Sequence, residues 1–157
     1  MKTKYQKIYN QSIKDFGHLE DDEIMGLTIF AEARGEPREG RIGVGSTILN
    51  RVDHRDWDGT TIMSVCLWPY QFSCYLPGDP NRNALVAFAG NFKTSCQRVK
   101  SLMGCYEIAR GMALGAIPRN TTALQYLNPL AAAKTKEKWL AAGMKVVMKI
   151  GGHEWFE

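Results

Sequence analysis

The 157-residue sequence has no continuous apolar run long enough to cross a membrane as a helix. Its first 22 residues contain four lysines and several acids, without the apolar stretch that a secretory signal or an anchor requires. We therefore expect a protein that is made in the cytoplasm without a signal peptide and that does not insert stably into a membrane.

The sequence also lacks the spacings that mark metal and cofactor sites. No two cysteines are separated by two residues, and none lies at ligand spacing from one of the three histidines. Neither a glycine-rich phosphate loop after an apolar strand nor a Gly-x-Ser-x-Gly elbow occurs. We expect no metal and no cofactor, and we expect buried free thiols rather than disulfides at Cys66, Cys74, Cys96 and Cys105.

A concentrated charge of one sign is missing as well. The net charge of +4 favours an anionic partner, such as a nucleic acid, an acidic lipid surface or an anionic cell-wall polymer. However, the basic residues are interleaved with acids, and there is no basic run and no aromatic ribonucleoprotein-type motif. A solvated mixed surface is the better interpretation, and we do not expect a nucleic-acid binder.

One amphipathic segment delivers a carboxylate to its own end. Ile24, Leu27 and Ala31 share a helical stripe, and Asp21 or Asp22 is placed to cap the helix. Gly35, as a left-handed cap, and the residues before Pro37 should end it, which puts Glu32 in the last turn.

A carboxylate is unfavourable at the carbonyl end of a helix, and apolar neighbours add a desolvation penalty. We therefore expect Glu32 to have a raised pKa. A carboxylic acid that keeps its proton near neutral pH is the proton donor that cleavage of a glycosidic bond requires. From the local pattern alone, a solvated glutamate in a short helix is the favoured alternative.

The length fits one domain, residues 1–157, in which residues 1–20 form a leading helix or extension and residues 21–157 form the core. The patterns predict an α+β fold that is mostly helical, with a small antiparallel sheet. We expect helices near residues 38–52, 60–66, 83–92, 95–114 and 134–142, and strands near residues 121–128 and 145–150. The aromatic segment 68–75, which contains Gln71 and Ser73, is either a sugar-binding wall or part of the core.

Several landmarks occur in an order that resembles a known family. They are Ala31-Glu32-Ala33-Arg34-Gly35-Glu36, Glu39-Gly40, Ile48-Leu49-Asn50-Arg51-Val52, Gln71-Phe72-Ser73, Tyr126-Leu127-Asn128-Pro129 and Ile150-Gly151-Gly152-His153. Together they resemble the cell-wall hydrolases typified by spore cortex-lytic enzymes, over roughly residues 24–156. The combination is specific, whereas any single piece would be weak.

The resemblance implies a lysozyme-like α+β domain that cleaves peptidoglycan between N-acetylmuramic acid and N-acetylglucosamine, typically as a lytic transglycosylase that forms a 1,6-anhydro sugar. It implies that Glu32 is the catalytic acid and then the base, with Glu36 as the runner-up. The residues that match substrate-binding positions are Gln71, Phe72, Ser73, Tyr126 and Asn128. For His153 we expect a structural role with its hydrogen bonds satisfied, and for Asn50 and Arg51 support of the fold.

The sequence departs from the family pattern because it shows no export signal and no wall-binding repeats, and because residues 76–100 look like an insertion. These departures favour a monomeric phage endolysin that is stored in the host cytoplasm and acts on the wall after release. A hydrolytic muramidase and a non-catalytic peptidoglycan-binding or virion structural module are the alternatives. The partner in each case is the peptidoglycan glycan strand.

Overall fold

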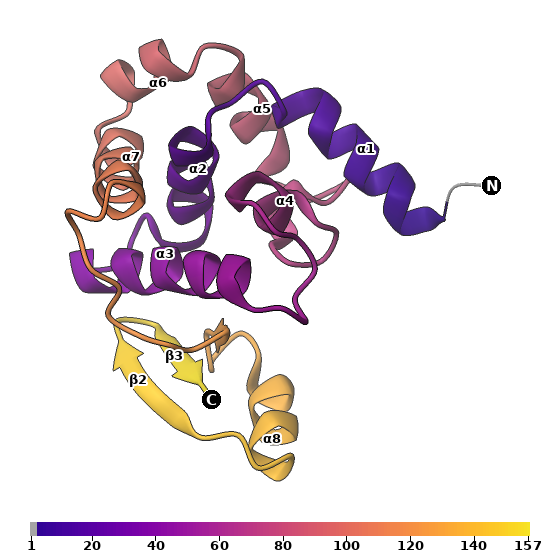
Figure 1. Cartoon of the computed structure of the whole chain (residues 1–157), viewed down its shortest axis with the longest axis vertical. Helices are drawn as coiled ribbons and strands as arrows, with labels where there is room; N and C mark the ends of the chain where they lie inside the picture. The colour runs from indigo at the N-terminus through magenta and orange to yellow at the C-terminus, as the bar shows by residue number, and fades with distance from the viewer. Residues whose placement is uncertain (1–2) are drawn as a thin grey trace.

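The computed structural model describes residues 3–157, in which two groups of elements lie on opposite sides of one helix (Figure 1). The helices are α1 (Lys4–Phe16), α2 (Asp21–Ala33), α3 (Arg38–Asp53), α4 (Ile62–Leu67), the 3-10 turn η1 (Ser73–Tyr75), α5 (Arg82–Gly90), α6 (Phe92–Arg98), α7 (Lys100–Ala113) and α8 (Ala133–Ala141). In Figure 1, α3 separates the other helices of the first two thirds of the chain from the sheet and α8. The predicted α+β class, mostly helical, is confirmed.

The sheet consists of β1 (Gln125–Leu127), β2 (Val146–Ile150) and β3 (His153–Phe156), in the order β1-β3-β2 with antiparallel pairs. All four residues of the central strand β3 are buried. Tyr126 of β1 pairs with Trp155 of β3, so the two rings lie on the same face of the sheet. The hairpin between β2 and β3 turns at Gly151, whose φ of +56° is a conformation that glycine adopts without strain.

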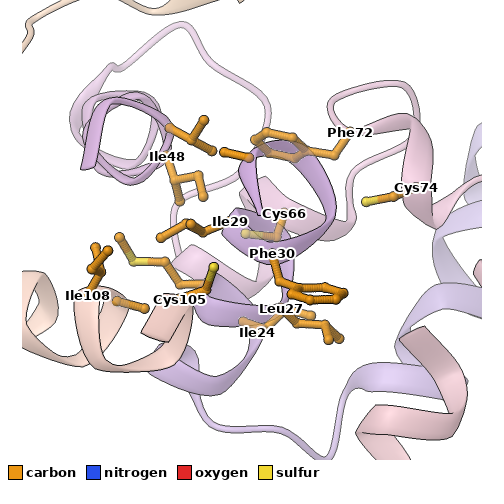
Figure 2. Close-up of a cluster of buried hydrophobic side chains, with 14 of the residues drawn as sticks. Ile24, Leu27, Ile29, Phe30, Ile48, Cys66, Phe72, Cys74, Cys105 and Ile108 are labelled. Carbon is orange, nitrogen blue, oxygen red and sulfur yellow. The ribbon is translucent and has the colours of Figure 1, made fainter. Parts of the chain in front are cut away.

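Helix α2 is the centre of the helical part. Every residue from 24 to 30 is buried, so this helix is enclosed on all sides instead of having one wet face. Figure 2 shows side chains of α2 together with others from α3, α4 and α7, among them Ile24, Ile29, Ile48, Cys66 and Ile108. The last turn of α2, which carries Glu32, is therefore part of a rigid element.

The two ends of α2 differ from the expected ones. The N-cap is Glu20, whose N–H donates to Glu23 Oε2 at 3.0 Å, and not Asp21 or Asp22. At the other end the cap is Arg34 in the right-handed region, and Gly35 has no positive φ. The helix stops because Pro37 begins α3 as its N-cap, so the direction of the chain changes without a left-handed residue.

Two further boundaries were predicted wrongly. The single helix expected over residues 95–114 is two helices, because Val99 is extended, with φ −116° and ψ 95°, and separates α6 from α7. The expected strand over residues 121–128 contains only the three residues of β1. Asn50 and Arg51 of α3 bind the carbonyl groups of Thr121, Ala123 and Leu124, so these carbonyls bond to side chains instead of a neighbouring strand.

The leading helix is confirmed as α1, and it packs on the rest of the structure through the buried ring of Phe16. The boundary between residues 20 and 21 stays a prediction. No helix among residues 3–157 is both long enough and apolar enough to cross a membrane. All four cysteines are buried free thiols, as expected.

Candidate active site

Glu32 lies in the last turn of α2, as predicted, and its side chain is half-buried. Burial raises its pKa above the ordinary value of 4.5, since the charged form loses solvation there. A hydrogen bond from Tyr126 and the positive charge of Arg51 oppose this shift, and the charge of Asp79 adds to it. The net result is a carboxyl group that holds its proton to a higher pH than a free glutamate.

Tyr126 of β1 contacts this carboxyl group directly. Its hydroxyl donates to Glu32 Oε2 at 2.9 Å. Burial and the Glu32 charge raise the pKa of Tyr126 well above its ordinary value, so the phenol stays neutral and remains a donor. Because Oε2 accepts this hydrogen bond, the carboxyl proton of Glu32 belongs on Oε1. The contact joins the helical part of the molecule to the sheet.

Two aromatic side chains of β3 hold the Tyr126 ring in place. The ring centroid of Trp155 lies 5.6 Å from that of Tyr126, and the centroid of His153 lies 5.2 Å away in an edge-on arrangement. Trp155 is itself fixed, because its Nε1 donates to Thr47 Oγ1 of α3 at 3.2 Å. The phenol is therefore oriented toward Glu32 by packing.

Arg51 of α3 is a member of the site that the sequence analysis assigned only to support of the fold. Its Nε donates to Leu124 O at 2.8 Å, two residues before Tyr126. Its guanidinium lies 4.7 Å from the ring centroid of Trp57 and 5.2 Å from that of Phe72. Its Nη1 is buried without a hydrogen-bond partner, and burial lowers the pKa of the group. Arg51 thus places a buried positive charge near Glu32 and also anchors the segment that leads to Tyr126.

A sequence signal for Arg51 exists in the pattern of α3. Positions 44, 48 and 51 share one helical face, and Val44 and Ile48 are fully buried there. A charged side chain on such an apolar face needs partners in the interior. Attention to this face would have marked Arg51 as a candidate site residue.

The structure gives the residues of the Gln71-Phe72-Ser73 motif three different environments. Phe72 is buried in the core beneath Arg51, and Figure 2 shows its ring above the α2 side chains. The Oε1 atom of Gln71 accepts a hydrogen bond from Trp57 Nε1 at 2.9 Å. Ser73 is exposed at the start of η1. Of the two readings of segment 68–75, Phe72 fits the core, whereas sugar contact by Gln71 and Ser73 stays a prediction.

Asn128 follows β1 and organises the next turn. Its Oδ1 accepts the N–H groups of Leu130 at 2.9 Å and Ala131 at 3.3 Å. The side chain is half-buried. Its predicted role in orienting a sugar is not tested by these contacts.

Glu36 and His153 form a second polar cluster beside the site. The N–H of Gly152 donates to Glu36 Oε2 at 3.0 Å, so Glu36 ties the turn between α2 and α3 to the β2–β3 hairpin. His153 Nδ1 lies 3.9 Å from Glu36 Oε1 and has no hydrogen-bond partner, which corrects the expectation that its bonds are satisfied. Burial lowers the pKa of His153, and the Glu36 charge opposes that shift.

Over residues 3–157, no three histidine, cysteine, aspartate or glutamate side chains converge as the ligands of a metal ion would. The site combines a carboxyl group with a raised pKa, a phenol that donates to it and a buried guanidinium. Such a group can donate a proton to a leaving oxygen and, once ionised, can accept one.

The chain is similar to known proteins both in sequence and in fold. A family model described as Cell Wall Hydrolase matches residues 35–156, a range that begins just after Glu32. The fold is similar to the catalytic domain of the germination-specific lytic transglycosylase SleB from Bacillus anthracis, with a TM-score of 0.63 and 23% identity over 90% of this chain and 98% of that one. It is also similar to the catalytic domain of the Bacillus cereus SleB protein, with a TM-score of 0.60 and 23% identity over 87% of this chain and 89% of that one.

A comparison with curated protein sequences gives no match. At the identities above, the two solved structures establish a common fold and leave the role of each site residue open. The family model, in contrast, spans most of the chain. The chain therefore belongs to the Cell Wall Hydrolase family and is a cell wall-cleaving enzyme.

Proposed function

We propose that the enzyme is a lytic transglycosylase that cleaves the β-1,4 bond between N-acetylmuramic acid and N-acetylglucosamine in peptidoglycan. The observation that carries this proposal is the half-buried carboxyl group of Glu32, with its raised pKa and its hydrogen bond from Tyr126. The Bacillus anthracis protein of similar fold is described as a lytic transglycosylase, which supports the same reaction class here.

In the proposed reaction, Glu32 donates the proton on Oε1 to the glycosidic oxygen while the bond from that oxygen to the anomeric carbon of the muramoyl residue breaks. The resulting carboxylate then takes the proton of the muramoyl 6-hydroxyl while the oxygen of that hydroxyl attacks the anomeric carbon. The new bond closes a 1,6-anhydro ring, Glu32 regains its proton, and no water is consumed. Because one carboxyl group performs both transfers, no second carboxylate is needed at the short spacing of a retaining pair.

Neighbouring residues support both states of Glu32. Arg51 stabilises the carboxylate that exists between the two proton transfers, since its positive charge lies close enough to lower the Glu32 pKa. We assign contacts with the sugar to Tyr126, Ser73 and the amide groups of Gln71 and Asn128, which would pair with hydroxyl and acetamido groups. For Phe72 we assign support of Arg51, because its ring lies beneath the guanidinium.

The test is digestion of purified peptidoglycan by the full chain, with the products identified by mass spectrometry. Anhydromuropeptides, which lack the mass of one water, are expected. Products with a free reducing end would replace the transglycosylase by a hydrolytic muramidase. Binding to sacculi without any cleavage would instead indicate a non-catalytic glycan-binding or virion structural module.

Glu32→Gln should lower the cleavage rate about 10³-fold, because the amide has a similar shape but cannot donate the proton. The matched control is Glu39→Gln, which changes an exposed glutamate in the first turn of α3 and should leave the rate unchanged. Both variants should still unfold in a cooperative melting transition and should still bind sacculi. Full activity of Glu32→Gln would remove Glu32 from the mechanism.

We also propose that the enzyme is a monomeric phage endolysin that folds in the host cytoplasm and reaches the wall after release. Its four buried free thiols support folding in a reducing compartment, because no disulfide is needed to hold the structure. The wild type and Glu32→Gln also test this role. Bacteria that express the wild type should lyse when their inner membrane is permeabilised, and cells that express Glu32→Gln should not.

A further inference from the structure

A pocket of about 490 Å³ lies between α1 and the segment that precedes α5, outside the candidate active site. Its lining residues are Lys4, Lys7, Ile8, Tyr70, Leu76 and Pro77. Both charged side chains in this lining are lysines, so the pocket is positive. In Figure 1, α1 lies at the outer edge of the helical part.

Tyr70 borders the pocket as the third residue of a turn that begins at Trp68, which the bond from Gln71 N–H to Trp68 O closes at 3.2 Å. Among residues 3–157 it is the one residue other than glycine with a positive φ, +69°. Its side chain is 52% exposed and meets the half-exposed Tyr5 edge-on, with 5.5 Å between ring centroids. Glycine or asparagine would adopt this backbone with less strain, and an exposed ring gains little from packing. The turn thus presents an exposed aromatic ring at the pocket, where a ligand can contact it.

The pocket is held in shape by contacts between α1 and the neighbouring segments. The ring of Tyr9 packs on Trp68 with 5.2 Å between centroids. Arg82 pairs with Asp15 near the end of α1 at 2.6 Å. The two walls are therefore fixed relative to each other before any ligand arrives, which lowers the entropic cost of binding.

The same segment connects this pocket to the candidate active site. Phe72, two residues after Tyr70, lies beneath Arg51, whose charge acts on Glu32. Helix α1 itself lies outside the range that the family model matches, so half of the pocket belongs to a part of the chain beyond that match.

We propose that this pocket, which we call the α1 pocket, is an accessory binding site for the glycan strand of peptidoglycan. Tyr70 stacks on the face of a sugar ring, and Lys4 and Lys7 pair with carboxylates of the stem peptides. Single exposed ion pairs are weak, so the contribution comes from linking this site to the active site along one strand. The choice of ligand rests on the proposed function.

Sacculus binding in the Glu32→Gln background tests the proposal, because the wall then stays intact during the measurement. We compare Tyr70→Asn and the double variant Lys4→Gln/Lys7→Gln with the background protein. Each should bind purified sacculi about tenfold more weakly. The matched control is Lys134→Gln/Lys138→Gln, which makes the same change of charge at two exposed lysines of α8 and should bind as the background does.

The melting temperature separates a ligand contact from a packing role. Tyr70→Asn should keep or raise it, because asparagine tolerates the left-handed conformation better than tyrosine. In the active enzyme, the pocket variants should cleave short soluble glycan fragments at the wild-type rate and intact sacculi more slowly. Amidation of the wall carboxylates should abolish the difference between the lysine variant and its background.

Several results would overturn the proposal. Unchanged sacculus binding in both pocket variants, or an equal loss of binding in the α8 control, would contradict a specific site. If the pocket variants also lost binding to duplex DNA to the same extent, the lysines would act only as nonspecific positive charge. A clear drop in the melting temperature of Tyr70→Asn would assign the ring to packing. Failure of the proposed function is a separate result. If the wild-type enzyme forms no anhydro product, the proposed function is wrong. The binding comparison is independent of that result, because it uses variants in the inactive Glu32→Gln background.

Discussion

At the scale of single residues, the site depends on two nearby glutamates with different surroundings. Glu32 is desolvated at the end of α2 and receives one hydrogen bond from a phenol. Glu36 instead accepts a backbone N–H from Gly152 and lies near His153, so its carboxylate connects two turns. A general acid must hold a proton and be able to release it, whereas a structural carboxylate works best when ionised. These surroundings favour Glu32 as the acid.

Replacing Tyr126 by phenylalanine should change both the rate and its pH dependence. The lost hydrogen bond lowers the pKa of Glu32 in the wild type, so its removal raises that pKa further. The alkaline limb of the pH profile of kcat, which marks ionisation of the acid, should move to higher pH. The maximal rate should fall about tenfold, because Glu32 becomes a weaker and less well oriented acid.

The control for this prediction is Tyr106→Phe, which removes a hydroxyl that contacts Asp22 at 3.5 Å. It should leave the pH profile unchanged. A pH profile of Tyr126→Phe that coincides with that of the wild type would show that the phenol does not act on the proton of Glu32.

The residues that could be predicted from the sequence are those whose chemistry is visible locally. The position of Glu32 in the last turn was predicted because Gly35 and Pro37 mark the end of its helix, although Gly35 does not adopt the predicted conformation, and the family resemblance then made Glu32 the candidate acid. Tyr126 was assigned to the sugar, but its bond to Glu32 joins positions 94 residues apart, which no local pattern encodes. The apolar face of α3 marks Arg51 as a buried charge, but its partners come from three separate segments, which the pattern of α3 does not identify.

At the scale of elements, α3 connects the helices to the sheet through positions without side chains. A Cβ built on Gly43 would lie 2.5 Å from Trp155 Cζ2, and one on Gly45 would lie 2.7 Å from the Met112 sulfur. A glycine within a helix indicates that another group approaches closely, but it does not identify that group. Helices α3, α4 and α8 were predicted with nearly correct bounds, since their apolar spacing or caps are local signals.

Gly43→Ala should destabilise the protein by about 1–3 kcal/mol, because the added methyl group collides with the buried Trp155 ring. Since Trp155 packs on Tyr126, activity should fall as well. Chemical denaturation with a parallel activity assay measures both effects. Gly104→Ala is the matched control, because the nearest atom to its Cβ is Arg41 Nη1 at 3.6 Å. It should stabilise α7 by up to about 1 kcal/mol, and equal behaviour of the two variants would contradict the predicted contact.

At the scale of the whole molecule, the candidate site exists only where the helical part and the sheet meet. Glu32 comes from α2, Arg51 from α3 and Tyr126 from β1, and the aromatic support of Tyr126 comes from β3. None of these groups is held in place by its own element alone. Assembly of both parts is thus needed to desolvate Glu32, and the free energy of folding is linked to its protonation.

This linkage makes the stability of the chain depend on pH in a direction that can be tested. The folded state raises the pKa of Glu32 above 4.5, so below pH 4.5 both states are protonated and the full stability is present. As the pH rises toward the folded pKa, the unfolded chain ionises more readily, and stability is lost. The amide of Glu32→Gln cannot ionise, so the melting temperature of this variant should rise relative to that of the wild type between pH 4 and pH 7.

Glu154 provides a control of opposite sign. The hydrogen bond from Lys136 is the main cause that lowers its pKa, and Lys149 adds to the shift, so its contribution is present above the unfolded pKa and is lost as the pH falls. Glu154→Gln should therefore be less stable than the wild type at pH 7 and approach it in acid. Calorimetric melting across this pH range measures both variants. A Glu32→Gln variant whose stability relative to the wild type is independent of pH would show that folding does not disfavour the Glu32 carboxylate, and the account of Glu32 as a retained acid would then fail.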